Sequence, residues 1–365
     1  MIKPVFRITL QVRLTMKNRI CMTNLALLYL IALLFGCQNP ESIDAYLTQQ
    51  YQEGKLNGNV LVIRNSETLY EKSFGYADGS KNTLLTKDYR FNIGSVYKEF
   101  PAVAIMQLVE KGQVSVDDNI AKFLPELPEW SQKVTVKHLL QYSSGLPRID
   151  WGSYFGQGIN VTETEIMNEI KSIETLNFEP GTDYLYTNNS PILLIKIVEN
   201  VTKTDFNKYV TENIFIPYNM PNTVVKDQYP YGDKSLMAIP FDSEFNEDNS
   251  RLSMSGLLFS STASDLSNWF QQLGDFEVVS KESVEFLSQG AKAGNNIQAP
   301  LGRCDWKNDE IVEHFHHGSS GNYECVVRRF KQEEITIAIL TNQKHGNVIE
   351  ISEEIYEIIK KDIQR

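Results

Sequence analysis

The stretch FNIGSVYKEFPAVAIMQLVEKG, residues 91–112, begins a helix in an unusual way. Apolar residues recur at helical spacing from Lys98 to Glu110, and Gly112 ends the pattern, so a helix is predicted here. Its first turn contains Ser95 and Lys98, three positions apart. A lysine is unfavourable at this end, because the helix dipole favours acidic side chains there. The position of Lys98 therefore indicates a chemical role.

Ser95-Val96-Tyr97-Lys98 is an S-x-x-K motif. Positions i and i+3 share a helix face, so Lys98 Nζ can reach Ser95 Oγ. A serine hydroxyl needs a neighbour that takes its proton before it becomes a good nucleophile, and loss of water lowers the pKa of a lysine towards that task. Backbone N–H groups at the helix start can bind an oxyanion. Taken alone, the motif is a weak signal and is more simply explained as a capping serine beside a solvated lysine.

A second motif, Tyr186-Thr187-Asn188, lies in FEPGTDYLYTNNSPILLI. The Pro-Gly pair at 180–181 predicts a turn, and an apolar helix is predicted from Pro191, which places the motif on a loop. A tyrosine hydroxyl can serve a nucleophilic serine as general base. The amide of Asn188 can bind a substrate carbonyl or the lysine. By itself, Tyr186 is more simply explained as a packing residue.

A third motif, HHGS at 316–319, lies on a predicted strand. Alternation puts His316 and Gly318 on the same face. The glycine leaves room for a substrate backbone to approach, and the N–H of Ser319 is expected to complete an oxyanion hole with that of Ser95.

Two further residue groups could form a metal site or a disulfide. His314, His316 and His317 lie within four positions, but no carboxylate or cysteine cluster at ligand spacing accompanies them, so neither a metal nor another cofactor is predicted. Cys304 and Cys325 are free to pair or to stay reduced, because the sequence does not show whether their Cα atoms lie close together.

Predicted strands cluster at both ends of the chain, and predicted helices fill the middle. The simplest fold is α+β: one antiparallel sheet built from both ends, flanking helices, and an inserted, mostly helical domain. The α/β part is expected at 41–80 and 296–365, and the insertion at 81–295. The predicted strands are 59–64, 68–76, 301–306, 311–316, 322–330 and 335–341, and the predicted helices are 43–53, 98–110, 136–142, 163–173, 191–201, 205–214, 263–273 and 348–363.

The N-terminus reads as a targeting segment. Basic residues precede the apolar run LALLYLIALLF at 25–35, which is shorter than the roughly 20 residues needed to span a bilayer and fits a secretory signal. The ending LFGC resembles a bacterial lipoprotein box, which predicts a leader at 1–37 and a lipid on Cys37. A plain secretory signal and a single anchor helix are the alternatives, and Met16 and Met22 are alternative starts. The expected location is the cell envelope, in the periplasm or on the outer membrane.

The overall charge argues against a nucleic-acid partner. The formal net charge of the 365 residues is -11, and five of the basic residues fall within the first twenty positions. Phosphate binding needs clustered Lys and Arg, and no basic stripe occurs elsewhere in the sequence. The expected partner is a small-molecule or peptide substrate, and the sequence does not determine the oligomeric state.

The three motifs, in this order on helix, loop and strand, resemble those of the serine β-lactamase and penicillin-binding-protein superfamily. The branch with Y-x-N as second motif includes class C β-lactamases, DD-peptidases and esterases. Stretches such as VKHLLQYSSGLP and SGLLFSSTASDLSNWF add to the resemblance, which runs from about Ile43 to the C-terminus. The implied roles are Ser95 as acylated nucleophile, Lys98 as aid to its deprotonation, Tyr186 as base, Asn188 as ligand of the acyl-side amide, His316 in the usual place of a lysine, and the amides of Ser95 and Ser319 as oxyanion hole.

The resemblance implies a serine hydrolase that works through an acyl-enzyme. His316 departs from the usual lysine, and an imidazole with a pKa of roughly 6.5 is only partly charged at neutral pH, which weakens the case for a β-lactamase. The expected order is esterase or peptidase first, DD-peptidase second and β-lactamase third. A penicillin-sensor-like protein without turnover is the alternative, and the presence of Tyr186 favours turnover.

Overall fold

The computed structural model describes residues 42–254, 256–293 and 298–363. The predicted leader and its lipid site Cys37 lie outside the described residues. The sheets and the candidate site lie within the unit Leu47–Arg365. In the described part of the chain, no helix is both long enough and apolar enough to cross a membrane.

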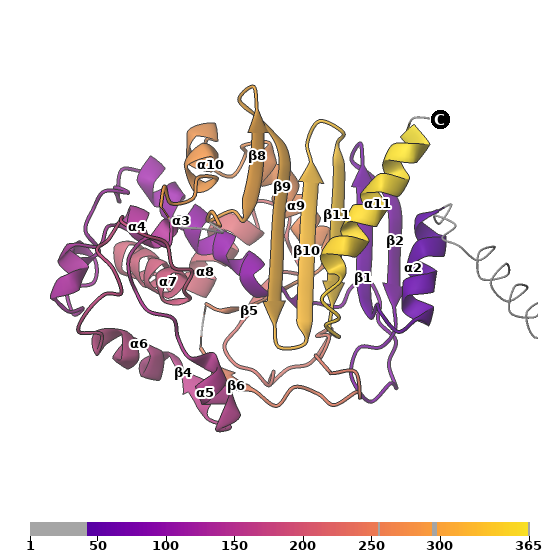
Figure 1. Ribbon diagram of the computed structural model, residues 1–365, viewed down its shortest axis with the longest axis horizontal. Coiled ribbons are helices and arrows are strands. Elements are labelled where there is room, and N and C mark those ends of the chain that lie inside the picture. The colour runs from indigo at the N-terminus through magenta and orange to yellow at the C-terminus, as the bar shows by residue number, and fades with distance from the viewer. Residues whose placement is uncertain (1–41, 255, 294–297, 364–365) are drawn as a thin grey trace, which may run out of the picture. The chain divides into compact units, whose positions relative to one another are not determined.

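The largest sheet has six antiparallel strands in the order β2-β1-β11-β10-β9-β8 (Figure 1). Strands from the two ends of the sequence meet where β1 pairs with β11, which confirms the expected α+β fold with one antiparallel sheet. Asn65 and Ser66 both have positive φ, as a two-residue hairpin turn between β1 and β2 requires. The strands are β1 (Gly58–Arg64), β2 (Glu67–Phe74), β8 (Arg303–Lys307), β9 (Glu310–Ser320), β10 (Tyr323–Phe330) and β11 (Ile335–Thr341).

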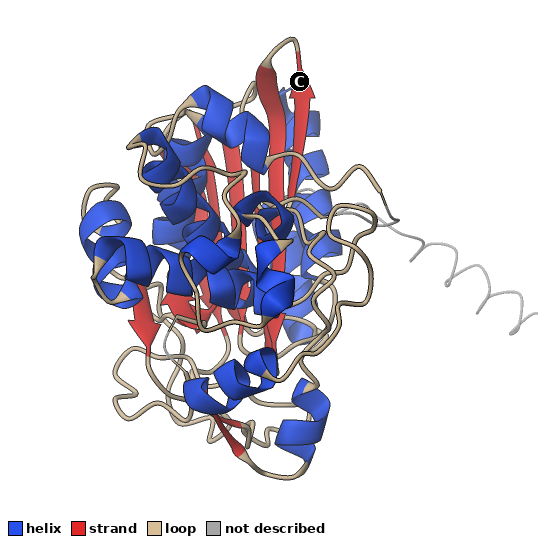
Figure 2. Cartoon of the chain, turned by 90° about the vertical axis from the view of Figure 1, so that its left-hand side faces the viewer, coloured by secondary structure: helices blue, strands red, loops and turns tan. Residues whose placement is uncertain are grey.

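Helices cover both faces of this sheet. Helix α11 (Val348–Ile363) crosses in front of β10 and β11, whereas α9 (Ala263–Gly274) contacts four strands from behind (Figure 1). Figure 2, seen from the side, shows helices on both sides of the strands. Every residue of β10 and β11 is buried, as expected for strands that are covered on two faces.

Most of the regular elements between β2 and β8 are helices, as expected. The limits of the inserted domain, 81–295, stay a prediction. Its helices are α3 (Glu99–Glu110), α4 (Val136–Leu140), α5 (Trp151–Gly156), α6 (Glu163–Lys171), α7 (Asn189–Thr202), α8 (Phe206–Val210), α9 and α10 (Lys281–Leu287). The short strands β3 (Phe91–Asn92), β7 (Leu258–Ser261) and β5 (Val224–Lys226) form a second sheet, and β4 (Asn160–Thr162) pairs with β6 (Arg251–Ser253). Helix α2 spans Ile43–Gln52.

The helix predicted at 205–214 is confirmed, and it divides into α8 and a π-helical turn, Thr211–Phe215. No helix is predicted between 142 and 163, but the structure has α5 there, whose start is capped by the Asp150 side chain. The sequence of α5, WGSYFG, contains two glycines, which lower helix propensity and concealed the helix.

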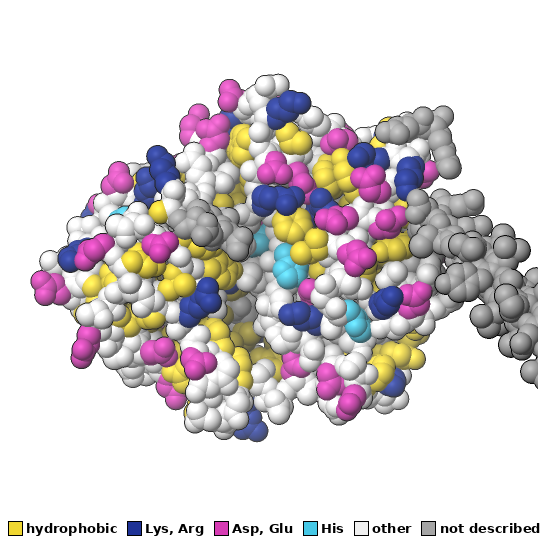
Figure 3. Space-filling view, viewed as in Figure 1, with side chains coloured by type: hydrophobic (Ala, Val, Ile, Leu, Met, Phe, Trp, Pro, Cys, Tyr) yellow, Lys and Arg dark blue, Asp and Glu magenta, His cyan; other side chains and the backbone are white. Residues whose placement is uncertain are grey.

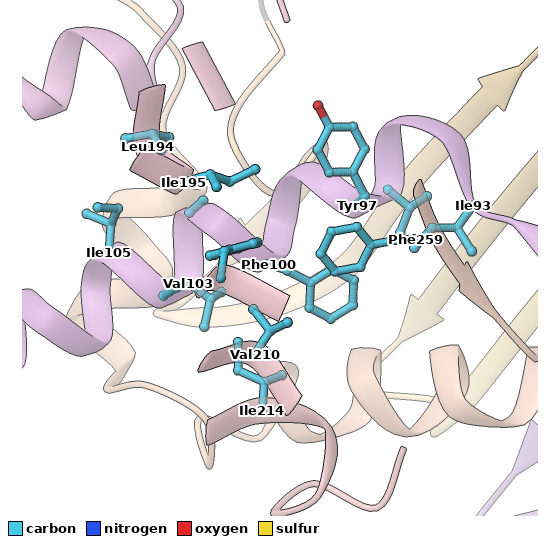
Figure 4. Packing of buried hydrophobic residues seen from close by; sticks show 14 of the residues in the cluster. Ile93, Tyr97, Phe100, Val103, Ile105, Leu194, Ile195, Val210, Ile214 and Phe259 are labelled. Carbon is cyan, nitrogen blue, oxygen red and sulfur yellow. The ribbon is translucent and has the colours of Figure 1, made fainter. Parts of the chain in front are cut away.

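Helix α3 is buried along nearly its whole length, and its packing fixes the turn before it. Phe100 stacks on Phe259 with ring centroids 5.0 Å apart and lies 4.7 Å from the ring of Trp269. Tyr97 stacks on Phe259 from the other side (Figure 4). A helix that is apolar on all sides belongs inside the protein, so α3 holds its N-terminal turn rigidly against the sheet.

Candidate active site

Ser95 lies on a short 3₁₀ helix, η1 (Gly94–Lys98), that leads directly into α3. A 3₁₀ helix has three residues per turn, so positions i and i+3 lie one above the other. Lys98 Nζ accordingly donates a hydrogen bond to Ser95 Oγ at 3.0 Å. The α-helix predicted from the sequence begins one residue later, at Glu99.

Lys98 is almost fully buried, with 5% of its surface exposed. Burial disfavours the ammonium form and lowers the pKa of Lys98 to about 7. Its Nζ lies 4.8 Å from the ring centroid of Tyr97 and 5.0 Å from that of Tyr186. A large fraction of Lys98 is therefore neutral at physiological pH and able to accept a proton from Ser95.

Tyr186 and Asn188 lie on the loop that enters α7. The Tyr186 hydroxyl lies beside Ser95, and burial raises the pKa of Tyr186 to about 12. Between the two motif residues, Thr187 donates to the carbonyl of Pro147 at 2.7 Å and so anchors the loop. Asn188 lines the same cavity as Ser95. The structure therefore brings the first two motifs together.

Gly318 lies against the backbone of η1. A Cβ at Gly318 would lie 2.0 Å from the carbonyl oxygen of Ile93 and 2.9 Å from the amide nitrogen of Ser95. Gly94 has a φ of +52°, and a Cβ there would lie 2.2 Å from the amide nitrogen of Ser319. Only glycine fits at either position, and the space beside Gly318 is filled by the chain's own backbone, whereas the sequence had suggested a substrate backbone. The amides of Ser95 and Ser319 are thus neighbours, as an oxyanion hole requires.

His316 occupies a different place from the one that the sequence suggested. Its side chain is buried and does not line the cavity beside Ser95. Its Nδ1 lies 2.6 Å from Glu99 Oε1, and its Nε2 lies 3.1 Å from Nε2 of Gln298. Burial lowers the pKa of His316, with a smaller effect of the same sign from Lys98, although Glu99 opposes the shift. In the neutral ring, Nδ1–H donates to Glu99 and Nε2 accepts from Gln298.

Glu99 is the important residue that the sequence analysis missed. Its fully buried carboxylate accepts hydrogen bonds from His316, from His314 at 3.0 Å and from the indole of Trp269 at 2.6 Å. Burial alone would raise the pKa of Glu99, but the two histidines outweigh it and lower this pKa to about 2. The available signal was an acid directly after S-x-x-K, together with two histidines that share a strand face.

The cavity beside Ser95 has a volume of about 260 Å³. Trp151 and Phe155 of α5 form part of its wall. Ser319, from the third motif near the end of β9, forms another part. The surface is hollowed where the helices on the left of Figure 3 meet the sheet. Lys344, an exposed residue outside this lining, donates to Ser319 Oγ at 2.7 Å.

Cys304 and Cys325 are both free. In the register of the sheet, Cys304 of β8 lies opposite His314 of β9. Cys325 of β10 lies opposite Gly318, on the other side of β9. Two strands that flank a third lie about 10 Å apart, beyond the roughly 7 Å that a disulfide can bridge. Within the described residues, no group of three or more His, Cys, Asp or Glu side chains has an arrangement that could hold a metal ion.

The serine, the buried lysine, the loop tyrosine and the paired amides define a site of the serine-hydrolase type that uses S-x-x-K. A family model agrees: the Beta-lactamase model matches residues 43–358, and the chain belongs to this family. The resemblance to the serine β-lactamase and penicillin-binding-protein superfamily is thereby confirmed.

The individual relatives share only a modest sequence identity with this chain. The chain is 27% identical to Penicillin-binding protein 4* of Bacillus subtilis (strain 168), with 82% of this chain and 71% of the relative covered. It is 24% identical to Protein flp of Staphylococcus aureus (strain MRSA252), with 83% and 62% covered, so it spans less than two thirds of that relative. D-amino acid amidase from Ochrobactrum anthropi SV3, complexed with L-phenylalanine amide, has the same fold, with a TM-score of 0.70, 18% identity, and 86% and 96% covered.

Replacing Glu99 by Gln should destabilise the protein. A neutral amide has a single oxygen acceptor and no charge, so it cannot accept the hydrogen bonds of His314, His316 and Trp269 as the carboxylate does. We expect a loss of about 3 kcal/mol at pH 7 in urea unfolding. The carboxylate of Glu99 has a lowered pKa in the folded state, so its contribution is complete above the pKa of the unfolded chain and disappears as the pH falls towards 2. The difference between the two proteins should therefore shrink between pH 5 and pH 3, and a difference independent of pH would contradict this view. The exposed Glu126→Gln is the control.

Proposed function

We propose that this protein is a serine hydrolase that cleaves an ester or amide through an acyl-enzyme on Ser95. The observation that carries the proposal is the contact between Ser95 Oγ and Nζ of the buried Lys98, whose pKa lies near 7. A serine with a neighbouring base of matched pKa is an activated nucleophile. A penicillin sensor without turnover would not need this arrangement together with Tyr186.

The acylation step follows from the positions of the protons. Ser95 Oγ attacks the substrate carbonyl and its proton passes to neutral Lys98, while the amides of Ser95 and Ser319 bind the oxyanion. Tyr186, with a pKa of about 12, is a protonated phenol at neutral pH, and from its position beside Ser95 it can donate a proton to the leaving group. Collapse of the tetrahedral intermediate then breaks the ester or amide bond.

Deacylation reverses these roles. The leaving-group proton that Tyr186 gave away is replaced from protonated Lys98, so both groups return to their starting states. Water then attacks the acyl carbonyl and gives a proton to the same pair. The bond between Ser95 Oγ and the acyl carbon breaks, the pair returns that proton to Oγ, and the free acid leaves. Asn188, which lines the cavity, is placed to orient the acyl group.

The site supports esters and peptides ahead of β-lactams. The ladder between β8 and β9 ends at Phe315, so the edge of β9 from 316 to 320 is open on that side within the described residues. An extended peptide can add to such an edge as a further strand. His316 is buried and tied to Glu99, so it does not offer the cation that a lysine at this position would give. We therefore rank an esterase or peptidase first, a DD-peptidase second and a β-lactamase third.

The proposal is tested by intact-protein mass spectrometry and ester turnover. Wild-type protein should hydrolyse an activated ester and carry a transient acyl mass on Ser95, whereas Ser95→Ala should lose both signals, with turnover reduced by roughly a thousandfold or more. Undiminished hydrolysis by Ser95→Ala would end the proposal. A persistent penicillin adduct without ester turnover would instead favour a sensor.

The pH dependence tests which group is the base. Because only neutral Lys98 accepts the serine proton, kcat/KM for an uncharged ester should rise with pH through about 7 and then level off. The arginine variant Lys98→Arg stays protonated and should be nearly inactive at every pH in this range. A rate that keeps rising beyond pH 9 would assign the base role to Tyr186 instead.

We also propose that the chain is anchored to the cell envelope through a lipid on Cys37. The support is the basic, apolar and small-residue order of the leader. In a bacterial host, the wild-type chain should sediment with membranes and incorporate radiolabelled palmitate. Cys37→Ser should lose the label, and equal labelling of both proteins would disprove the anchor.

A further inference from the structure

A second compartment of about 270 Å³ adjoins the cavity beside Ser95. The two share part of their walls, including Phe155 of α5, Leu252 of β6, and Ser320 and Gly321 at the end of β9. A substrate group attached to the reacting carbonyl can therefore pass from one compartment into the other. No motif in the sequence pointed to this compartment.

Aromatic rings form much of its wall. Tyr229, Tyr231 and Tyr323 are all buried, and their hydroxyls are engaged within the protein. Tyr229 donates to the carbonyl of Asp248 at 3.2 Å, and Tyr323 donates to the carbonyl of Ala238. Because these hydroxyls already have partners, what the tyrosines can contribute to the wall is the apolar surface of their rings.

Asp248 alone carries a charge among the described residues that line this compartment. Its carboxylate accepts hydrogen bonds from the backbone and side-chain amides of Asn322, which leaves lone pairs on both oxygens. A Cβ at Gly321, where φ is +54°, would lie 2.1 Å from Asp248 Oδ2. The turn between β9 and β10 is therefore built around a fixed negative charge.

A fixed carboxylate beside aromatic rings matches one chemical group, an organic cation. The ring faces attract a cation, and the carboxylate supplies a counter-charge and hydrogen-bond acceptors. We propose that this compartment binds a protonated amine at the end of a flexible chain of the substrate. This inference rests on the proposed hydrolase function and names a substrate class for it. The amine can belong to the acyl group or to the leaving group, and the experiment separates the two.

The test compares matched esters that differ only in the terminal group. The acyl pair is the p-nitrophenyl esters of 6-aminohexanoate and heptanoate, and the leaving-group pair is the acetates of 6-aminohexanol and 1-heptanol. In at least one pair, wild-type kcat/KM should favour the ammonium substrate by roughly fivefold to tenfold, and the pair that responds identifies the side of the scissile bond. Added salt should reduce the preference.

Asp248→Asn should abolish this preference, and the ratio of two kcat/KM values cancels any general loss of active protein. Glu247→Gln is the matched control, because Glu247 is exposed, lies outside both linings and should leave the ratio unchanged. Hydrolysis of the neutral esters without any preference in either pair would overturn the inference and leave the hydrolase proposal intact.

A binding measurement covers the case in which no ester is turned over. Calorimetry with Ser95→Ala should show tighter binding of 6-aminohexanamide than of heptanamide, and the difference should vanish when Asp248→Asn is added. Equal affinities would overturn the inference, whereas a clear difference would support it even if the hydrolase proposal failed.

Discussion

The close contact between the backbones of η1 and β9 is the constraint on which the site depends. Neither Gly94 nor Gly318 has room for a Cβ, so the helical segment and the sheet approach one another as closely as two backbones can. This approach sets the amides of Ser95 and Ser319 side by side. Glu99, the residue after Lys98, stabilises the same contact between η1 and β9, because it accepts hydrogen bonds from His314 and His316 of β9. The position of Ser95 is therefore fixed by the sheet as well as by its own helix.

Two buried ionisable groups follow one another in the chain, and their different directions explain their different states. Lys98 points back towards Ser95 and Tyr186, whereas Glu99 points towards β9. If the two side chains formed an ion pair, the carboxylate would hold Lys98 in its charged form and raise its pKa. The histidines and Trp269 engage Glu99 instead, and burial is the cause of the lowered pKa of Lys98. The network around Glu99 thus leaves Lys98 available as a base.

Local sequence signals, which are periodicity and motif spacing over a few residues, predicted the strands at both ends, most of the helices and the contact between Ser95 and Lys98. That Tyr186 and Asn188 join them was implied by the family resemblance. The partners of Glu99 could not be predicted, because His314 and His316 are 215 and 217 residues away in the chain.

The same limit applies to the roles of other motif residues. The reason for Gly318 became clear only from the backbone that faces it, and the order of β8, β9 and β10 decided that the two cysteines do not pair. The second compartment combines residues from α5, from the segment 229–252 and from the turn after β9, which are far apart in the chain, so no single short stretch of sequence contains it.

His316 in the third motif removes a positive charge from the cavity. A partly protonated histidine that faced the cavity would only have weakened that charge. Because His316 is buried and its protonation is disfavoured, it adds to a structural network and leaves the cavity without that positive charge. Lys344 lies at the rim, but its ammonium is exposed and acts on the nearby Glu324 as well. With Lys98 partly neutral at pH 7, the fixed charge within the two compartments is that of Asp248. A substrate carboxylate would enter this region against an unfavourable field, whereas a positively charged or neutral group would not. This is a physical reason for ranking esters ahead of DD-peptides and β-lactams, both of which carry a carboxylate.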